Sequence, residues 1–345
     1  TPEAWVAIAG ALGRSLPTSP SQRQLLVDIS VLVQVDAKSG IQRVVRSVLL
    51  ELLSNPPEGW RVEPVYYTAE LGFQYARGFT LGFLECPLDA LDDQPIDTRR
   101  GDLFFVLDLQ PAPQPGQEEA YAALRRSGVA VYFTVYDLLP LEFPDYFPRA
   151  LSVQFRQWFS MVAQADGALC ISRSVADMVI EKLREMPSTQ ERRFDVGYFH
   201  LGSDILSSKP SRGLPAGFED ELSFLARRPT ILCVGTIEPR KGYRQVLDAF
   251  ELLWQRGEEV CLAIVGKRGW GTDDIVERLE AHPEAGRRLR WYPRLSDEAL
   301  LKLYPACSGV LVASEGEGFG LPVVEAMRHG KPVLVRDLPV FREVG

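Results

Sequence analysis

The chain has 345 residues, of which 46% are hydrophobic and 24% are charged. A chain of this length usually folds as two domains, and its ordinary composition excludes a disordered protein, a low-complexity fibre and a small disulfide-stapled scaffold. The formal charge of −8 argues against a protein that works mainly through nonspecific contact with nucleic acid or anionic lipid, and we expect no nucleic-acid partner.

Hydropathy, cysteine usage and the N-terminal segment together predict a cytoplasmic protein. No apolar run reaches the roughly 18 residues of a membrane-spanning helix. The five cysteines are odd in number and widely separated, as buried thiols in a reducing compartment are. Residues 1–24 are expected to be an N-terminal extension, whose apolar patch at 5–12 lacks the basic start of a secretory signal. Peripheral attachment of this patch to the inner face of the cytoplasmic membrane stays open, and the Thr1 start predicts a piece of a longer protein.

Apolar strand-like runs alternate with helical periods from residue 25 onward, which predicts an α/β protein with a parallel sheet covered by helices on both faces. In the first half, the expected strands lie at 25–32, 62–67, 103–108, 129–137, 168–172 and 196–201. The expected helices, each with one apolar stripe, lie at 41–53 and 149–163.

The segment 207–217 interrupts this rhythm with two prolines and two glycines, as an interdomain linker would. We therefore expect an N-terminal domain at 25–206, a linker at 207–228 and a C-terminal domain at 229–345. In this second domain the expected strands lie at 230–237, 260–265, 288–292, 309–313 and 332–335, and the expected helices at 243–256, 273–280, 297–304 and 321–329. Another helix begins near residue 341, so the second domain is expected to be incomplete at its C-terminus.

Ligands of open α/β sheets bind outside the carboxyl ends of the strands, so the loops at this edge are the informative places. One candidate is the turn at Gly40, which opens a helix whose free amides would approach an anion. The alternative is a turn glycine followed by a solvated Arg43. A second candidate is Asp137, which ends an expected strand before the proline-rich segment 138–144. It would either face a ligand or cap a turn.

Adjacent cations, Arg240 and Lys241, stand between the first strand and the first helix of the second domain, shortly after Gly235 and Thr236. A helix start disfavours cations unless an anion is present. A diphosphate would resolve this conflict, because Arg grips two oxygens at once and Lys supplies a compact charge. The spacings of a P-loop and of a dinucleotide-binding glycine motif are both missing. The alternative is a solvated Arg-Lys pair.

A glycine-rich loop precedes the expected helix at 321–329, and its glycines would let a ligand approach the backbone. Glu317 lies in this loop. Glu325 lies about one turn into the helix, where its carboxylate would accept hydrogen bonds from two sugar hydroxyls while the helix start faces phosphate. Two alternatives stay open. The two carboxylates could be the acid and base of a hydrolase, or Glu325 could merely stabilise the helix dipole.

Together these four loops resemble those of retaining nucleotide-sugar glycosyltransferases of the GT-B fold, family 4, particularly bacterial mannosyltransferases that build O-antigen and related polysaccharides. The likeness covers roughly residues 25–345. Its most specific piece, Glu317-Gly-Phe-Gly-Leu-Pro-Val-Val-Glu325, is similar to the family's E-x7-E motif, and the segments 235–241 and 336–344 look like the same subgroup. The resemblance implies two Rossmann-like domains that face each other across a cleft, the first for the acceptor and the second for the donor.

By this resemblance, Arg240 and Lys241 would hold the donor diphosphate and form the catalytic set with Asp137 and Glu317. Many relatives have His-Asp where this chain has Tyr136-Asp137, so Tyr136 would offer at best a hydroxyl contact. Glu325 would bind the ribose, Gly40 would close the phosphate site, and the base would rest near Arg294 and Leu295. The residues expected to bind the nucleotide sugar are Gly40, Gly235, Thr236, Arg294, Leu295, Gly318, Phe319, Gly320 and Glu325.

The resemblance implies transfer of a hexose, with mannose from GDP-mannose as the best guess, to a glycan or lipid-linked glycan. Charge develops on the departing diphosphate, and Arg240 and Lys241 would stabilise it without a metal, so no essential metal or cofactor is expected. Two alternatives are a nucleotide-sugar epimerase of the same fold and a non-catalytic module of a larger polysaccharide synthase. The irregular segment 71–84 is rich in aromatic residues, which would stack on acceptor sugars or, the favoured interpretation, form core.

Overall fold

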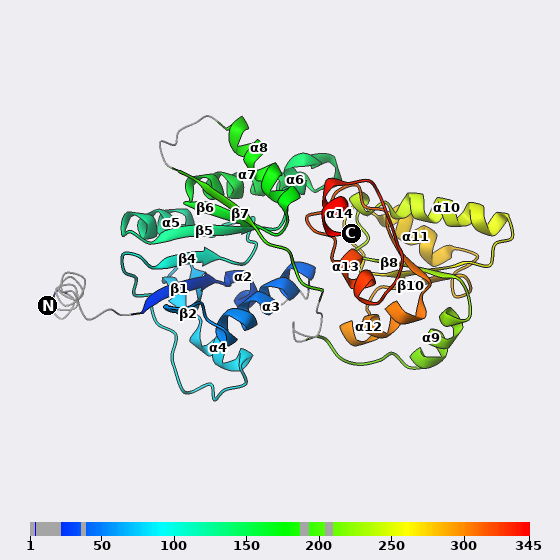
Figure 1. Cartoon of the computed structure of the whole chain (residues 1–345), viewed down its shortest axis with the longest axis horizontal. Coiled ribbons are helices and arrows are strands. Elements are labelled where there is room, and N and C mark those ends of the chain that lie inside the picture. Colours follow the sequence, from blue (N-terminus) through cyan, green and yellow to red (C-terminus); the bar gives the residue numbers. More distant parts are fainter. Residues whose placement is uncertain (1–3, 5–21, 36–38, 187–192, 204–209) are drawn as a thin grey trace. The chain divides into compact units, whose positions relative to one another are not determined.

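The computed structural model has two sheets, one built from residues 23–198 and one from residues 230–335, each with helices packed on it (Figure 1). The alternation of strands and helices therefore confirms the predicted α/β class. The residues that the structure describes are 4, 22–35, 39–186, 193–203 and 210–345.

The first sheet has the strand order β3-β2-β1-β4-β5-β6-β7. Strand β1 pairs in parallel with β2 and β4, and β4 pairs in parallel with β5, whereas β3 is antiparallel to β2. The strands are β1 (Arg23–Asp28), β2 (Trp60–Thr68), β3 (Gly72–Tyr75), β4 (Leu103–Val106), β5 (Ala130–Val135), β6 (Gly167–Cys170) and β7 (Asp195–Tyr198). The helices are α2 (Ser30–Gln34), α3 (Gly40–Ser54), α4 (Arg77–Phe83), α5 (Gln117–Arg126), α6 (Leu139–Glu142), the 3₁₀ turn η1 (Pro144–Tyr146), α7 (Arg149–Gln164) and α8 (Arg173–Glu185).

Two segments of the first sheet differ from the prediction. The strand expected at 25–32 ends at Asp28, because the Asp28 carboxylate accepts hydrogen bonds from the Ser30 amide (3.0 Å) and hydroxyl (2.5 Å) and the chain turns into α2. The segment 71–84, expected to be irregular, forms strand β3 and helix α4. Phe73 and Tyr75 are 7% and 5% exposed, so they are core residues, as favoured. Phe79 and Phe83 on α4 are only half-buried and stack on each other.

The second sheet is parallel throughout, with the order β10-β9-β8-β11-β12. Helix α9 occupies much of the expected linker at 207–228, and its Leu225 is fully buried in the core of this sheet. The strands are β8 (Thr230–Val234), β9 (Cys261–Val265), β10 (Leu289–Tyr292), β11 (Gly309–Val312) and β12 (Val333–Val335). The helical elements are α9 (Phe218–Ala226), the 3₁₀ turn η3 (Pro239–Lys241), α10 (Tyr243–Gln255), α11 (Asp273–Ala281), α12 (Asp297–Ala306), α13 (Leu321–Arg328) and α14 (Pro339–Val344).

Alternating side chains of the second sheet enter two separate cores. Leu232 and Ala263 pack with residues of α9, α12, α13 and α14 on one face. Their neighbours Cys233 and Ile264 pack with residues of α10 and α11 on the other. Because both faces are covered, strands β9, β11 and β12 are apolar along their whole length, which is why they read as continuous hydrophobic runs in the sequence.

Contacts divide the chain into two compact units. The first unit comprises Thr1–Thr134, Trp158–Ala168 and Glu191–Asp195, and the second comprises Val135–Gln157, Leu169–Gln190 and Val196–Gly345. The loop after β5 and helix α8 thus belong to the same unit as the second sheet. Within the described ranges, no helix is long and apolar enough to cross a membrane.

Candidate functional site

The candidate site forms where the neighbouring parallel strands β8 and β11 end. The loop after β8 passes through η3 into Gly242, which has a φ of 70° and precedes helix α10. A β-carbon on Gly242 would lie 2.6 Å from the carbonyl oxygen of Ala313, just beyond β11. The amide of Glu315 donates to the carbonyl of Arg240 over 2.8 Å. Glycine is therefore required at 242 for these two loops to pack backbone against backbone.

Three of the predicted catalytic side chains meet between these loops. Lys241 forms a short ion pair with Glu317, and Nη1 of Arg240 lies 3.3 Å from the other oxygen of the same carboxylate. The same nitrogen donates to the carbonyl of Gly316 over 2.8 Å. The exposed fractions of the Arg240, Lys241 and Glu317 side chains are only 14%, 13% and 10%. We call these three residues the charge cluster.

Electrostatics keep Glu317 ionised. Burial alone would raise its pKa, but Lys241 and Arg240 hold the pKa of Glu317 at about 2. A second carboxylate, Glu238, lies 3.1 Å from Nε of Arg240. Burial raises the pKa of Glu238 despite the attraction of Arg240. Burial also works against the charged form of Arg240, yet Glu317 and Glu238 raise the pKa of Arg240 above its ordinary value.

Asp137, the fourth predicted catalytic residue, lies beside the glycine-rich loop. A β-carbon on Gly318 would lie 2.1 Å from the carbonyl oxygen of Tyr136 and 3.1 Å from Cβ of Asp137. The Ser172 hydroxyl donates to the carbonyl of Gly318 over 2.7 Å. Burial raises the pKa of Asp137, and the positive charge of Arg240 is the strongest opposing influence. The Tyr136 side chain is 1% exposed and is a core residue here.

The helix after the glycine-rich loop buries Glu325. This residue is 2% exposed, and the Tyr304 hydroxyl donates to its carboxylate over 2.6 Å. Phe319 is also buried, at 4% exposure. Gly320 has a φ of 95°, and a β-carbon there would lie 2.8 Å from the ring of Phe341. Glu325 and Phe319 are thus inside the protein, and their predicted contacts with the ribose and the sugar stay predictions.

The remaining predicted binding residues lie on three separate loops. Gly235 and Thr236 follow β8 directly, on the same loop as the two cations. Arg294 and Leu295 follow β10. Arg294 is exposed, and Leu295 packs against the core of the second sheet. Gly40 begins helix α3 in the first unit. The roles predicted for these five residues stay predictions.

Sequence reasoning missed three residues that shape the site. A β-carbon on Gly266 would lie 1.9 Å from the carbonyl oxygen of Gly235, and one on Gly269 would lie 2.5 Å from that of Ile237. These two glycines let the loop after β9 pack against the loop after β8, and the density of glycine after that strand was a usable signal. The third is Glu238, the second carboxylate beside the charge cluster, which lies inside the motif segment 235–241 but was given no role.

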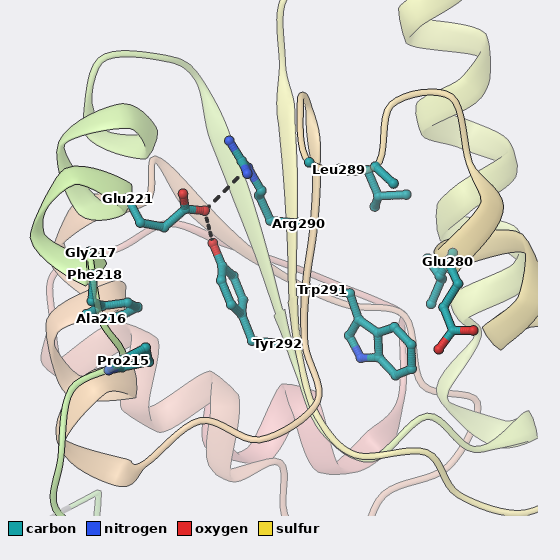
Figure 2. A pocket seen from close by; sticks show the side chains of 13 residues that line it. Pro215, Ala216, Gly217, Phe218, Glu221, Glu280, Leu289, Arg290, Trp291 and Tyr292 are labelled. Atoms are coloured by element: carbon teal, nitrogen blue, oxygen red, sulfur yellow. Dashed lines mark hydrogen bonds and ion pairs between the residues drawn. The ribbon is translucent and has the colours of Figure 1, made fainter.

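A cavity of about 480 Å³ lies along the edge strand β10, next to helices α9 and α11 (Figure 2). None of the predicted site residues lines it. Its main polar groups pair with each other, because Glu221 accepts from the Tyr292 hydroxyl and lies 3.3 Å from Nε of Arg290 (Figure 2). The indole N–H of Trp291 donates to the carbonyl of Gly266 over 2.9 Å. With its main polar groups already paired, this cavity is a weaker candidate than the charge cluster.

Comparison with protein families bears directly on the second sheet. The sequence over residues 219–344 matches the family described as Glycosyl transferases group 1. These residues are a glycosyltransferase group 1 domain. The domain contains the whole charge cluster, Glu238, Glu325 and the loops that hold them.

Curated relatives of this glycosyltransferase domain and its flanking sequence include mannosyltransferases. The serotype-specific mannosyltransferase WbdA of Escherichia coli is 40% identical over 328 residues, which are 93% of this chain and 38% of that protein. The O-antigen chain mannosyltransferase B of Escherichia coli is 29% identical over 212 residues, 61% of this chain and 54% of that protein. The chain thus spans about two fifths of the length of WbdA.

Solved structures agree in fold. The crystal structure of Anabaena Alr3699/HepE in complex with UDP-glucose has a TM-score of 0.58 and 16% sequence identity, and the match covers 93% of this chain and 82% of that chain. At this identity the likeness shows the fold alone. Together with the two Rossmann-like sheets, it confirms the predicted GT-B fold.

Proposed function

We propose that this chain is a retaining glycosyltransferase that moves a hexose from a nucleotide sugar to a glycan or lipid-linked glycan during synthesis of an O-antigen or related polysaccharide. Mannose from GDP-mannose is the donor that we favour. The observation that carries the proposal is the charge cluster, which places two cations after β8 and their carboxylate partner after β11 inside a glycosyltransferase group 1 domain. The 40% identity to the mannosyltransferase WbdA supports the choice of sugar.

The chemistry demands what Arg240 and Lys241 supply. When the bond between the anomeric carbon and the diphosphate breaks, negative charge develops on the departing diphosphate. Donors that are already in place stabilise that charge without reorganising, and the contacts of Arg240 with Glu238 and Gly316 hold its guanidinium in place beforehand. The two cations thus replace a metal ion in this role, and we propose that catalysis needs no metal.

The anomeric configuration is retained if the acceptor attacks the anomeric carbon from the same face that the diphosphate leaves. Asp137 is the group that we place nearest to the reacting carbon. It lies against the glycine-rich loop, and the electrostatic influence of Arg240 and Glu317 on its pKa indicates that it is close to the charge cluster. Glu317 would face the donor sugar from the same loop.

The test is a transfer assay with the purified full chain. GDP-mannose and several UDP and dTDP sugars are each incubated with and without a lipid-linked oligosaccharide or mannan primer, in buffer with and without EDTA. We expect free nucleotide to appear only with primer, the anomeric configuration to be retained by NMR, and EDTA to change the rate by less than about 2-fold.

Other outcomes would replace the proposal. Conversion of the donor to an epimer without any primer would indicate a nucleotide-sugar epimerase. Binding of a nucleotide sugar that no acceptor consumes would indicate a non-catalytic module of a larger synthase. Loss of activity in EDTA that Mg²⁺ or Mn²⁺ restores would contradict the metal-free role of Arg240 and Lys241.

A further inference from the structure

We infer that Glu317 is an internal counter-ion that lets the site distinguish the nucleotide-sugar donor from the nucleoside diphosphate product. The inference rests on the proposed function, in which Arg240 and Lys241 hold the donor diphosphate. It adds that the carboxylate competes with the diphosphate for these cations, and that only a ligand carrying a sugar compensates for this competition.

The competition is visible in the contacts of the charge cluster. One oxygen of Glu317 pairs with Lys241, and the other lies 3.3 Å from Nη1 of Arg240. Both carboxylate oxygens therefore engage the groups that a diphosphate would need. The Glu317 side chain is 10% exposed, so little water is available to replace these partners. A diphosphate that binds both cations must move the carboxylate aside or lie next to it.

Protonation does not relieve the conflict. The two cations hold the pKa of Glu317 at about 2, so the group stays negative at neutral pH. Glu238 and Asp137 are further carboxylates beside Arg240, so the surroundings offer no surplus of positive charge. A like charge next to a bound anion in a largely buried site weakens binding by about 10- to 100-fold.

The sugar of the donor removes part of this penalty. A hexose carries hydroxyl donors next to the diphosphate, and a carboxylate that has left Lys241 can accept hydrogen bonds from them. A nucleoside diphosphate lacks these hexose hydroxyls on the far side of its diphosphate, so Glu317 remains beside the phosphate oxygens without compensation. The product is therefore bound more weakly than the donor, which favours its release after transfer.

The decisive variant is Glu317→Gln, which keeps the shape and removes the charge. Dissociation constants for GDP and for GDP-mannose are measured by titration calorimetry without acceptor, or for UDP and UDP-glucose if the wild type prefers uridine. We expect the variant to bind the diphosphate about 10- to 100-fold more tightly and to change the affinity for the nucleotide sugar by less than about 3-fold. An unchanged or weaker affinity for the diphosphate, or equal tightening of both ligands, would overturn the inference.

Glu315→Gln is the matched control for net charge. Glu315 lies on the same loop, but its carboxylate accepts from the Tyr146 hydroxyl over 2.5 Å and lies 3.7 Å from Arg336. The control should change both affinities by less than about 3-fold, because its charge is paired away from Arg240 and Lys241. If it tightens diphosphate binding as much as Glu317→Gln does, the effect is one of overall charge and the inference is wrong.

Two further variants keep the test informative if Glu317→Gln folds poorly. Glu317→Asp retains the charge and should keep the discrimination between diphosphate and nucleotide sugar within about 3-fold of the wild type. In a Lys241→Ala background, Glu317→Gln should tighten diphosphate binding less than it does in the wild type, since one of the two contested cations is gone and Arg240 remains. Discrimination lost in Glu317→Asp, or undiminished tightening in the double variant, would contradict the counter-ion role. Melting temperatures establish which variants are folded.

The results also separate this inference from the proposed function. A wild type that binds none of the nucleotide sugars contradicts the proposed function, and the counter-ion role with it. A wild type that binds and transfers the sugar, with the same diphosphate-to-donor affinity ratio in Glu317→Gln, contradicts the counter-ion role alone.

Discussion

The carboxyl ends of the two sheets both carry buried carboxylates, but in opposite surroundings. In the first sheet, Asp28 and Asp108 are 2% and 3% exposed. Asp28 accepts from the hydroxyls of Ser30 (2.5 Å) and Tyr121 (3.0 Å), and Asp108 accepts from the amide of Leu32 (2.6 Å). With these neutral donors, burial raises the pKa of Asp28, and it raises the pKa of Asp108 to about 7.

At the second sheet, a largely buried carboxylate, 10% exposed, shows the opposite result. Glu317 faces Lys241 and Arg240, and its pKa is held at about 2. At Glu317 the attraction of Lys241 and Arg240 outweighs burial, whereas at Glu238 burial outweighs the attraction of Arg240 and the pKa is raised. The loops at the carboxyl ends of the first sheet, here called the first edge, therefore carry a carboxyl group that can bind a proton. The corresponding loops of the second sheet, the second edge, carry cations that can bind an anionic ligand.

The largest expected effect concerns the first edge and its dependence on pH. Because Asp108 binds its proton more tightly in the folded than in the unfolded chain, its contribution to stability is complete below about pH 4 and is lost as the pH rises through about 7. In the wild type, the free energy of unfolding should fall by about 4 kcal/mol between pH 4 and pH 8 through Asp108, and Asp108→Asn should abolish this fall. Urea unfolding across this range measures it.

The control for this prediction is Asp89→Asn, at an exposed position between α4 and β4. It should leave the slope of stability against pH as in the wild type. If the free energy of unfolding of Asp108→Asn still falls with pH as in the wild type, the pH dependence belongs to other groups. The two sheets would then not differ in the way described for Asp108 and Glu317.

The second expected effect concerns catalysis at the second edge. Lys241→Ala removes one preorganised cation and should lower turnover by about 10²- to 10³-fold, the scale for loss of one charge-stabilising donor. Steady-state release of nucleotide in the transfer assay measures it. Lys302→Ala, which removes a surface lysine paired with Glu219, should keep normal turnover. Near-normal turnover of a folded Lys241→Ala variant would refute the role of this lysine.

The third effect concerns how the second edge is built. A β-carbon at Gly318 would lie 2.1 Å from the backbone carbonyl oxygen of Tyr136, which cannot move aside cheaply. Gly318→Ala should therefore lower the free energy of unfolding by about 1–3 kcal/mol and also reduce turnover. Gly202→Ala is the control, because a β-carbon there would have no atom within 4 Å. Equal stability of the two variants would mean that the loop does not need this close approach.

The smallest effect tests the neutral donors of the first edge. Ser30→Ala removes the hydroxyl that donates to Asp28 and accepts from the Tyr67 amide over 2.9 Å. The free energy of unfolding should fall by about 1–2 kcal/mol, because Asp28 and the Tyr67 amide each lose a buried hydrogen-bond partner. The exposed Ser223→Ala should change it by less than about 0.5 kcal/mol. If the free energy of unfolding of Ser30→Ala equals that of the wild type, the Ser30 hydroxyl does not stabilise Asp28.

Local sequence patterns predicted the element order because both sheets are covered by helices. Fully buried parallel strands such as β9 read as apolar runs of five residues, and helix α10 repeats its apolar positions at helical spacing. Strand β3 escaped prediction because its burial depends on pairing with β2, a partner that local periodicity does not report. The early end of β1 escaped because one side-chain hydrogen bond, between Ser30 and Asp28, turns the chain there.

The sequence by itself determined the class of fold, the two loops that carry Arg240, Lys241 and Glu317, and the need for an anion near the cations. Spacing and residue type suffice for these conclusions, because they act over a few neighbouring residues. Only the tertiary structure decided that Glu317 takes both cations as partners, that Glu238 lies beside Arg240 and that Glu325 is turned into the core. The contacts of Glu317 and Glu325 depend on distances between segments that are 76 and 21 residues apart and on the water excluded between them, and no local pattern encodes either quantity. The contact of Glu238 depends on how the loop after β8 is folded.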